Sequence, residues 1–247
     1  MRVQEFGQQN ADVILLLHGG GLSWWNYCAV AKLLSEQYHV VLPVLDGHAD
    51  SDVPFITIEE NASRLIFYIN HHFDGKVLAI GGLSLGGQIA AEMLTQCPSI
   101  CRYAMLESTL VKPMKLTSAL IGPTFGVSFG LIRQKWFAKI QAAYLGIPKA
   151  RFDDYYRDTR KISKADMIAF LKANSKFTIR RSLSETTAKV KIVAGSREQK
   201  RIRDSAKLLH RAIPGSSMEI LTGLRHGDLS LNTPEQYAKI LTDWIGA

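Results

Sequence analysis

Short apolar runs that alternate with helical patterns constrain the fold of this chain more than any other feature. Residues 13–17 are five consecutive aliphatic residues, which is typical of a strand buried on both faces. Repeated strand–helix units predict an α/β fold with a mostly parallel open sheet and helices on both faces. Further strands are expected at 38–44, 76–81, 101–106, 190–194 and 218–221, and helices at 25–36, 57–72, 85–96, 199–211 and from 233 onwards.

The strand–helix alternation stops between residues 111 and 187. This stretch has a helical, amphipathic pattern interrupted by Pro113, Pro123 and Pro148, and it contains no good strand candidate. We therefore expect a single domain, residues 1–247, whose core comprises 1–110 and 188–247, with a helical insertion at about 111–187. Ligands of open α/β sheets bind at the carboxyl ends of the strands, so a helical insertion placed there is a candidate lid.

The net charge of +8 is concentrated in one segment. Residues 131–211 carry 21 basic and 7 acidic side chains, whereas residues 1–130 and 212–247 are each acidic on balance. A solvated helical surface accounts for such an excess, and so does attraction of an anionic substrate or partner. Nucleic acid is not expected as a partner, because no recognition motif accompanies the charge.

Other features of the chain bear on its compartment and its ligands. The first six residues lack the basic start and long apolar stretch of a signal peptide, and no apolar run is long enough to span a bilayer. We interpret Cys28, Cys97 and Cys101 as reduced thiols and expect a cytoplasmic protein. No spacing among the seven histidines indicates a metal site, and no cofactor is expected. The oligomeric state stays open.

Ser84 is the strongest candidate for a catalytic residue. It lies in Gly82-Leu83-Ser84-Leu85-Gly86, a pattern that chance alone produces in roughly one chain in ten of this length. The pattern gains weight because it follows an expected strand and precedes an expected helix. A nucleophile elbow needs this order, since its sharp turn strains the serine and exposes the hydroxyl. A plain glycine turn before a helix is the competing interpretation.

A serine hydroxyl is a weak nucleophile without a base, and His226 is the best candidate for that base. It lies in Gly223-Leu224-Arg225-His226-Gly227, after the last expected strand and before the last helix. That position returns its side chain to the edge of the sheet where Ser84 is expected. An exposed loop histidine is the alternative.

The imidazole must be oriented by a carboxylate, for which two candidates compete. Glu198 follows the strand at 190–194, and Glu107 follows the strand at 101–106, so both lie at carboxyl ends of strands. We favour Glu198 and keep Glu107 as the alternative acid. Asp204 and Asp228 fit less well, because the first lies inside a helix and the second is two residues from the histidine.

Glycines 19–21 follow the first long strand and suggest an oxyanion hole. They allow backbone N–H groups to converge on one point, and the N–H of Leu85, next to Ser84, would be the partner donor. A flexible strand-to-helix turn is the other interpretation of these glycines. We interpret His18 as a structural histidine that binds backbone groups.

With these motifs in this order, the chain resembles the α/β-hydrolase superfamily over essentially its whole length. The resemblance implies Ser84 as nucleophile, Glu198 as acid and His226 as base, with Gly20 and Leu85 as oxyanion-hole donors. Two positions depart from the family pattern. The acid is more often Asp than Glu, which keeps Glu107 as an alternative. Ala49 also stands where relatives commonly have Gly.

The expected function is therefore that of a serine hydrolase. It would act on a small carboxylic ester, or a thioester or related acyl compound, through an acyl-serine intermediate. An acyl pocket could be lined by aromatic residues, of which the candidates are Trp24, Trp25, Phe125, Phe129 and Trp136, but we favour core or lid packing for most of them. The alternatives are a non-hydrolytic or carbon–carbon bond-cleaving enzyme with the same triad, and a catalytically silent binding protein.

Overall fold

The computed structural model describes residues 1–246, and the side chains of all of these except 115 and 126–128. Within these residues, seven strands form one sheet in the order β1-β3-β2-β4-β5-β6-β7. β1 pairs antiparallel with β3 and every other neighbouring pair is parallel, so the predicted mostly parallel sheet is confirmed. The strands are β1 (Val3–Phe6), β2 (Val13–Leu17), β3 (His39–Pro43), β4 (Val77–Leu83), β5 (Cys101–Glu107), β6 (Lys189–Gly195) and β7 (Ser217–Leu221).

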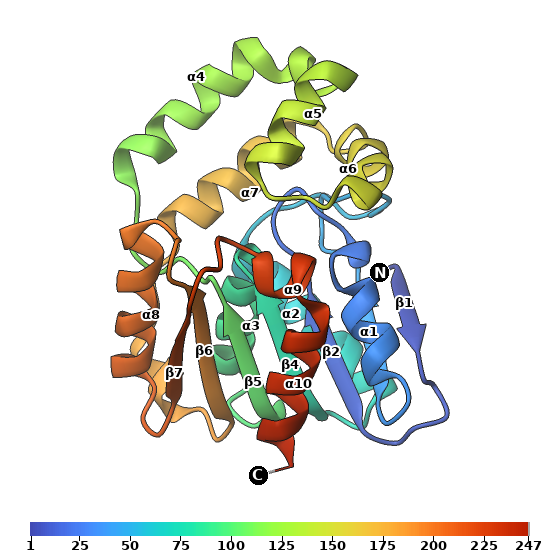
Figure 1. Cartoon of the computed structure of the whole chain (residues 1–247). Coiled ribbons are helices and arrows are strands. Elements are labelled where there is room, and N and C mark those ends of the chain that lie inside the picture. The colour runs from blue at the N-terminus through green and yellow to red at the C-terminus, as the bar shows by residue number, and fades with distance from the viewer. Residues whose placement is uncertain (247) are drawn as a thin grey trace.

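Helices cover both faces of the sheet, as Figure 1 shows. Successive side chains of β2 point to opposite faces of the sheet, and both faces are buried, which explains why its sequence is apolar throughout. Leu15 and Leu17 pack into the cluster that includes α2 (Ile58–His72), α3 (Leu85–Gln96) and α8 (Lys200–Ala212). Ile14 and Leu16 pack into the opposite cluster with α1 (Cys28–Leu34) and α10 (Pro234–Ile245).

Two of the helices begin with a side-chain cap. The hydroxyls of Thr57 and Ser163 each accept a hydrogen bond from the backbone N–H three residues further on, at 3.0 Å, and cap α2 and α7 (Lys164–Lys176). Thr233 is the residue before α10, which begins at Pro234 as expected, but its hydroxyl caps no N–H group of that helix. Its hydroxyl donates instead to the carbonyls of Asp228 and Leu229 in α9 (Asp228–Asn232), a short helix that was not predicted from the sequence.

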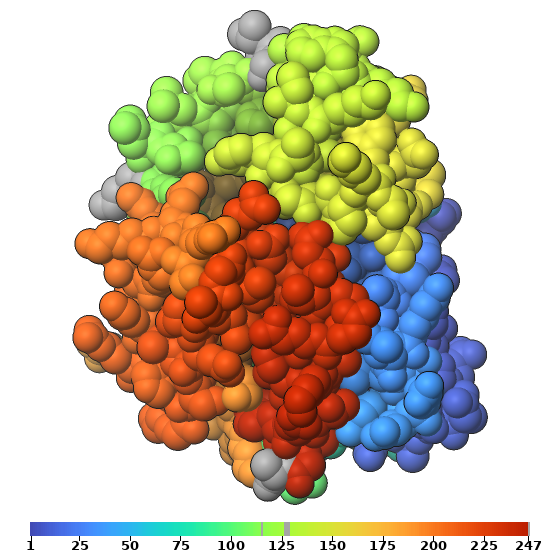
Figure 2. Space-filling view, in the orientation of Figure 1, coloured from blue at the N-terminus to red at the C-terminus, as the bar shows by residue number. Residues whose placement is uncertain are grey.

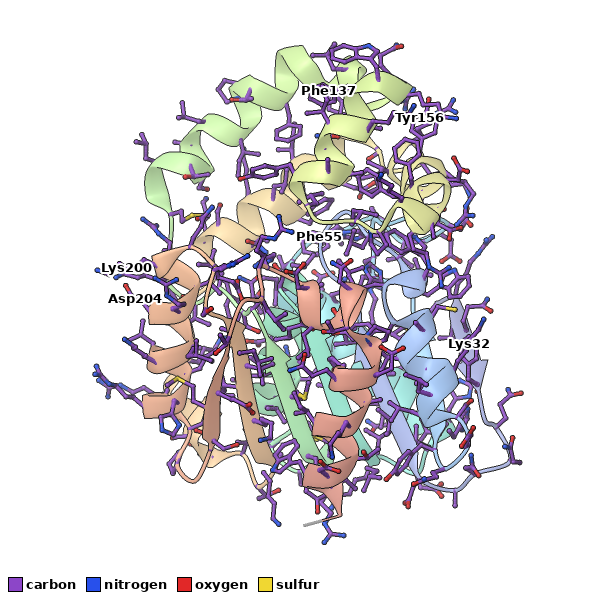
Figure 3. All side chains as sticks on the ribbon, viewed as in Figure 1. Lys32, Phe55, Phe137, Tyr156, Lys200 and Asp204 are labelled. Atoms are coloured by element: carbon purple, nitrogen blue, oxygen red, sulfur yellow. The ribbon has the colours of Figure 1, made fainter. Side chains whose placement is uncertain are left out.

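Between β5 and β6 the chain forms α4 (Lys115–Ile132), α5 (Lys135–Tyr144), α6 (Phe152–Thr159) and α7 (Lys164–Lys176), here called the inserted helices. They lie at the end of the sheet where β4 and β5 finish (Figure 1). Phe55, between the core and these helices in Figure 3, helps to attach them. Its N–H donates to Asp166 Oδ1 of α7 at 2.8 Å, and its ring packs edge-on against Phe170.

The structure also bears on the cysteines, on Ala49 and on membrane-spanning helices. Cys28, Cys97 and Cys101 are free thiols, and burial raises the pKa of the Cys101 thiol to about 12. Ala49 has a φ of 44°, in the left-handed region that favours glycine. None of the helices in the described part of the chain is long and apolar enough to cross a membrane.

Candidate active site

Ser84 occupies the single residue between β4 and α3. Its φ of 53° and ψ of −109° lie in a sparsely populated region, which costs a residue with a side chain about 1–3 kcal/mol. The surrounding backbone holds it there: the Ser84 N–H donates to the carbonyl of Glu107 at 2.9 Å, and the Ser84 carbonyl accepts from the N–H of Gln88 at 3.0 Å. The turn therefore carries the strain expected of a nucleophile elbow.

The two glycines of the elbow are required by close backbone approach. A Cβ on Gly82 would lie 2.4 Å from the carbonyl carbon of Gly86. A Cβ on Gly86 would lie 2.1 Å from the carbonyl oxygen of Leu17. No side chain fits at either position without movement of the backbone, so the G-x-S-x-G spacing follows from the geometry of the turn.

His226 and Glu198 are brought together from two different loops. The Nδ1 atom of His226 lies 2.8 Å from Glu198 Oε2. The other carboxylate oxygen accepts hydrogen bonds from Ser108 Oγ at 2.7 Å and from the Gly195 N–H at 2.8 Å. Burial alone would raise the pKa of Glu198, but the hydrogen bond and charge of His226, with those two donors, hold it below its ordinary value. Glu198 is thus an anion that can stabilise a protonated imidazole.

Glu107 occupies a different environment. Its carboxyl is fully buried, accepts the Ser230 N–H at 3.2 Å and lies 3.5 Å from the Tyr27 hydroxyl. In the described structure no hydrogen bond or ion pair joins it to His226. Burial raises the pKa of Glu107 to about 7, and the donors at Ser230 offset only part of that rise. Of the two candidate acids, only Glu198 contacts the histidine.

The expected oxyanion loop lies against the start of α3. A Cβ on Gly20 would lie 3.6 Å from the Cβ of Leu85, so the two backbones are adjacent. His18 holds this loop: its Nδ1 is 2.9 Å from the Gly19 carbonyl and its Nε2 accepts the Leu45 N–H at 3.1 Å. Burial lowers the pKa of His18 to about 3, so the ring is neutral and binds backbone groups, as expected.

Two cavities meet at Ser84 and His226. The smaller, of about 190 Å³, is mostly apolar and is lined by Gly19, Gly20, Leu22, Leu83, Leu145, Ile147, Phe170, Leu171, Asn174, Gly227 and Leu231. The larger, of about 380 Å³, adds Leu110, Met114, Tyr144, Gly146, Arg197, Glu198, Gln199, Ile202, Arg225 and Asp228. In Figure 2 the surface is recessed near this larger cavity, where the green α4 and yellow-green α5 meet the orange α8.

The expected core or lid packing agrees with the positions of most of the five aromatic residues, since Trp24, Trp25, Phe125 and Phe129 pack in or against the two core clusters. Among the residues described around these two cavities, none of the five is present, and the aromatic wall of the smaller cavity is Phe170. Trp25 is buried in the core and donates through Nε1 to Asp158 of α6 at 3.0 Å. Trp136 lies on the outer surface of α5.

Comparison with known proteins identifies the family of this chain. A family model described as the alpha/beta hydrolase family matches residues 14–240. The chain belongs to the alpha/beta hydrolase family. A protein of Gibberella zeae, described as an AB hydrolase superfamily protein, is 27% identical over 243 residues, which cover 95% of this chain and 80% of that one.

Solved structures with the same fold include an esterase from Exiguobacterium antarcticum, with a TM-score of 0.82 at 20% identity, covering 99% of this chain and 95% of the other. An enol-lactonase from Burkholderia xenovorans gives a TM-score of 0.84 at 14% identity, covering 100% and 96%. At these identities the likeness concerns the fold.

Some residues of this alpha/beta hydrolase site were not anticipated. Arg197 and Arg225 line the larger cavity. Each directly precedes a candidate catalytic residue, Glu198 or His226, and this adjacency in the sequence could have pointed to them. Ser108 is likewise adjacent to the alternative acid Glu107, but its contact with Glu198 joins segments 90 residues apart and is not visible in the sequence. Among the described residues, no group of three His, Cys, Asp or Glu side chains could hold a metal ion.

Proposed function

We propose that this alpha/beta hydrolase is a serine esterase in which Ser84 is the nucleophile, His226 the general base and Glu198 the acid. The observation that carries the proposal is the 2.8 Å contact between His226 Nδ1 and the Glu198 carboxylate, beside a strained Ser84 that shares both cavities with the histidine. With Nδ1 committed to Glu198, the other ring nitrogen remains for proton transfer.

The chemistry follows from these positions. His226 removes the hydroxyl proton as Ser84 Oγ attacks the ester carbonyl, and Glu198 stabilises the imidazolium that results. The protonated histidine then donates its proton to the departing alcohol, which leaves an acyl-serine. In the second half His226 removes a proton from water, the hydroxide attacks the acyl carbon, and the carboxylic acid departs as Ser84 recovers its proton.

The backbone N–H groups of Gly20 and Leu85 would stabilise the oxyanion of both tetrahedral intermediates. Their adjacent backbones support this role, as does the start of α3 directly behind Ser84, where the helix dipole favours negative charge. Removal of one donor of this kind costs about 3 kcal/mol of transition-state stabilisation.

The cavities indicate a substrate with two different arms. The smaller cavity, about 190 Å³, has room for about six groups of the size of a water molecule at ~30 Å³ each, which suits a short apolar acyl chain. The larger cavity carries Arg197, which makes no ion pair with any described residue, and Arg225, whose Nε is 3.7 Å from Asp228. We therefore favour esters with a small acyl group and an anionic group on the other arm.

The inserted helices would act as a lid over this site. Tyr144 and Leu145 from the end of α5, with Phe170 and Asn174 from α7, line the cavities around Ser84. Movement of these helices would therefore open or close the route to the nucleophile. The three free cysteines are compatible with a reducing compartment, and we place the enzyme in the cytoplasm.

Labelling with a fluorophosphonate and turnover of p-nitrophenyl acetate test the proposal. We expect the wild-type protein to be labelled at Ser84 and to hydrolyse the ester, whereas Ser84→Ala loses labelling and about six orders of magnitude in kcat. Ser184→Ala, at an exposed serine far along the chain, is the matched control and should behave as wild type. Absence of both labelling and turnover in the wild-type protein would refute the assignment.

A further inference from the structure

Large apolar side chains are exposed in an unusual concentration on the inserted helices. Of the twelve exposed large apolar residues in the described structure, seven fall within residues 116–145. The other five are scattered over the rest of the chain. Single exposed apolar residues are normal on a soluble protein, but a gathering of this kind marks an interaction surface.

The spacing of these residues places them on outward stripes. On α5, Trp136, Ile140 and Tyr144 follow one another at four-residue intervals and are 58%, 59% and 81% exposed, whereas Ala138 and Ala142 face inward. On α4, Leu116 and Leu120 have the same spacing and are 77% and 54% exposed. Both helices lie at the outer end of the molecule, with α7 between α4 and the sheet (Figure 1). We call these five side chains the outer stripe.

The charge around the outer stripe has one sign. No acidic residue occurs between Glu107 and Asp153, a stretch that carries seven basic residues. Within it, Lys139 and Lys149 are exposed and form no ion pair with any described residue. Arg133 and Lys135 lie over the rings of Phe129 and Tyr156 without a carboxylate partner among the described residues. Figure 3 shows Tyr156 beside α5 at this end of the molecule.

We propose that the outer face of α4 and α5 docks on an anionic lipid surface. This face combines exposed apolar side chains with nearby lysines and one arginine, Arg133, that lack carboxylate partners among the described residues. An anionic lipid surface binds both features, because the apolar groups enter the acyl boundary and the cations meet the headgroups. The protein would lie on the membrane without crossing it, in keeping with the absence of a spanning helix from the described chain.

The charge also argues against a second copy as the occupant of this face. A face-to-face dimer would bring Arg133, Lys135 and Lys139 close to the same residues of the second copy. No acidic residue lies between Glu107 and Asp153 to separate these charges, and like charges brought together across an interface are strongly unfavourable. Anionic headgroups supply the opposite charge that the segment itself lacks.

Docking in this orientation would bring the active site close to the lipid. The outer stripe ends at Tyr144, which also lines the larger cavity with Ser84. An amphiphilic ester could then enter the cavity from the membrane surface. The docking itself does not depend on the esterase proposal, since it rests on the outer stripe and its charge.

Vesicle co-sedimentation of the full chain tests this inference. We expect binding to phosphatidylcholine vesicles that contain phosphatidylglycerol, weakened by high salt, and little binding to phosphatidylcholine alone. Tryptophan emission should shift to the blue on binding, and this shift should be lost in Trp136→Phe. The double variant K135Q/K139Q should bind about 30-fold more weakly, since each lysine near such a surface contributes about 1 kcal/mol. Ile140→Ser with Trp136→Ser should lower binding at least about tenfold.

Matched controls remove an apolar or a basic side chain elsewhere. Phe67→Ser, 62% exposed on α2, and Lys207→Gln, exposed on α8, should bind vesicles as wild type does. All variants should keep the wild-type rate with p-nitrophenyl acetate. Equal binding to both vesicle types, or unchanged binding by the outer-stripe variants, would overturn the proposal. A solution dimer that Ile140→Ser converts to a monomer would overturn it in favour of a second copy.

Discussion

The identity of the carboxylate behind His226 can be decided by comparing Glu198→Gln with Glu107→Gln. The two glutamates share a position at the end of neighbouring strands, and each amide nearly preserves the shape of the side chain. What differs is the state of charge, because Glu198 is held as an anion and burial raises the pKa of Glu107 to about 7. The same substitution should therefore have very different effects at the two sites.

The loss expected for Glu198→Gln follows from its contact with the imidazole. Unit charges 2.8 Å apart attract by roughly 6 kcal/mol at an effective dielectric constant of about 20. The His226 side chain is 44% exposed, so solvent screening reduces this to roughly 3–5 kcal/mol. At 1.36 kcal/mol for each factor of ten, kcat/KM should fall by about two to four orders of magnitude.

Glu107→Gln should change kcat/KM by less than about tenfold. At neutral pH the Glu107 carboxyl is close to half protonated, and the glutamine carbonyl can still accept the Ser230 N–H. Both variants are assayed with p-nitrophenyl acetate, and thermal unfolding shows whether each is folded. A loss from Glu107→Gln equal to or larger than that from Glu198→Gln would refute the assignment of Glu198 as the acid.

Three other expectations can be tested on the same protein. Arg197→Gln and Arg225→Gln should each lower kcat/KM for 4-acetoxybenzoate about fivefold or more relative to neutral 4-acetoxybenzamide, whereas Arg211→Gln should leave the ratio unchanged; equal effects of all three would exclude a local anion site. The folded-state pKa of Glu107 is raised from 4.5 to about 7, so the wild-type free energy of unfolding should fall by about 3 kcal/mol as the pH rises through this interval. Denaturant titrations should show no such fall in Glu107→Gln, and parallel curves for the two proteins would contradict the buried carboxyl. Ser84→Gly should be more stable than Ser84→Ala by about 1 kcal/mol in the same titrations, because glycine adopts the positive φ without strain, and the reverse order would contradict the strained elbow.

The sheet and the elbow were predictable because their signals are local. The five aliphatic residues of β2 can be explained only by burial on both faces, and the glycines around Ser84 reflect contacts within a few residues of the turn. β1 escaped prediction because Val3–Phe6 is a four-residue edge strand with only partly buried or exposed side chains. Because such an edge strand buries few of its side chains, its apolar pattern is too weak to distinguish it from a loop.

The surroundings of the candidate acids could not be predicted, since they depend on contacts between distant segments. Glu107 and Glu198 each end or follow a strand, and the sequence alone does not show which one reaches His226. The choice follows from Gly195 and Ser108, which donate to Glu198 and aim its free oxygen at the imidazole. Helix α9 was missed for a different reason, because its five residues are too few to show a helical pattern.

The buried polar groups beneath the site connect the parts that would have to act together. The Gly19 N–H donates to Asn26 Oδ1 at 3.1 Å, and Asn26 donates to Ser230 at 3.3 Å. The Ser230 N–H donates to the Glu107 carboxyl, whose backbone carbonyl in turn holds the N–H of Ser84. This chain of hydrogen bonds links the glycine loop after β2, the helix after His226 and the turn at Ser84. Burial of the Glu107 carboxyl without a cation beside it costs folding free energy. Its position at this junction offers a physical reason for the cost, because it fixes the spacing between the three segments on which the proposed reaction depends.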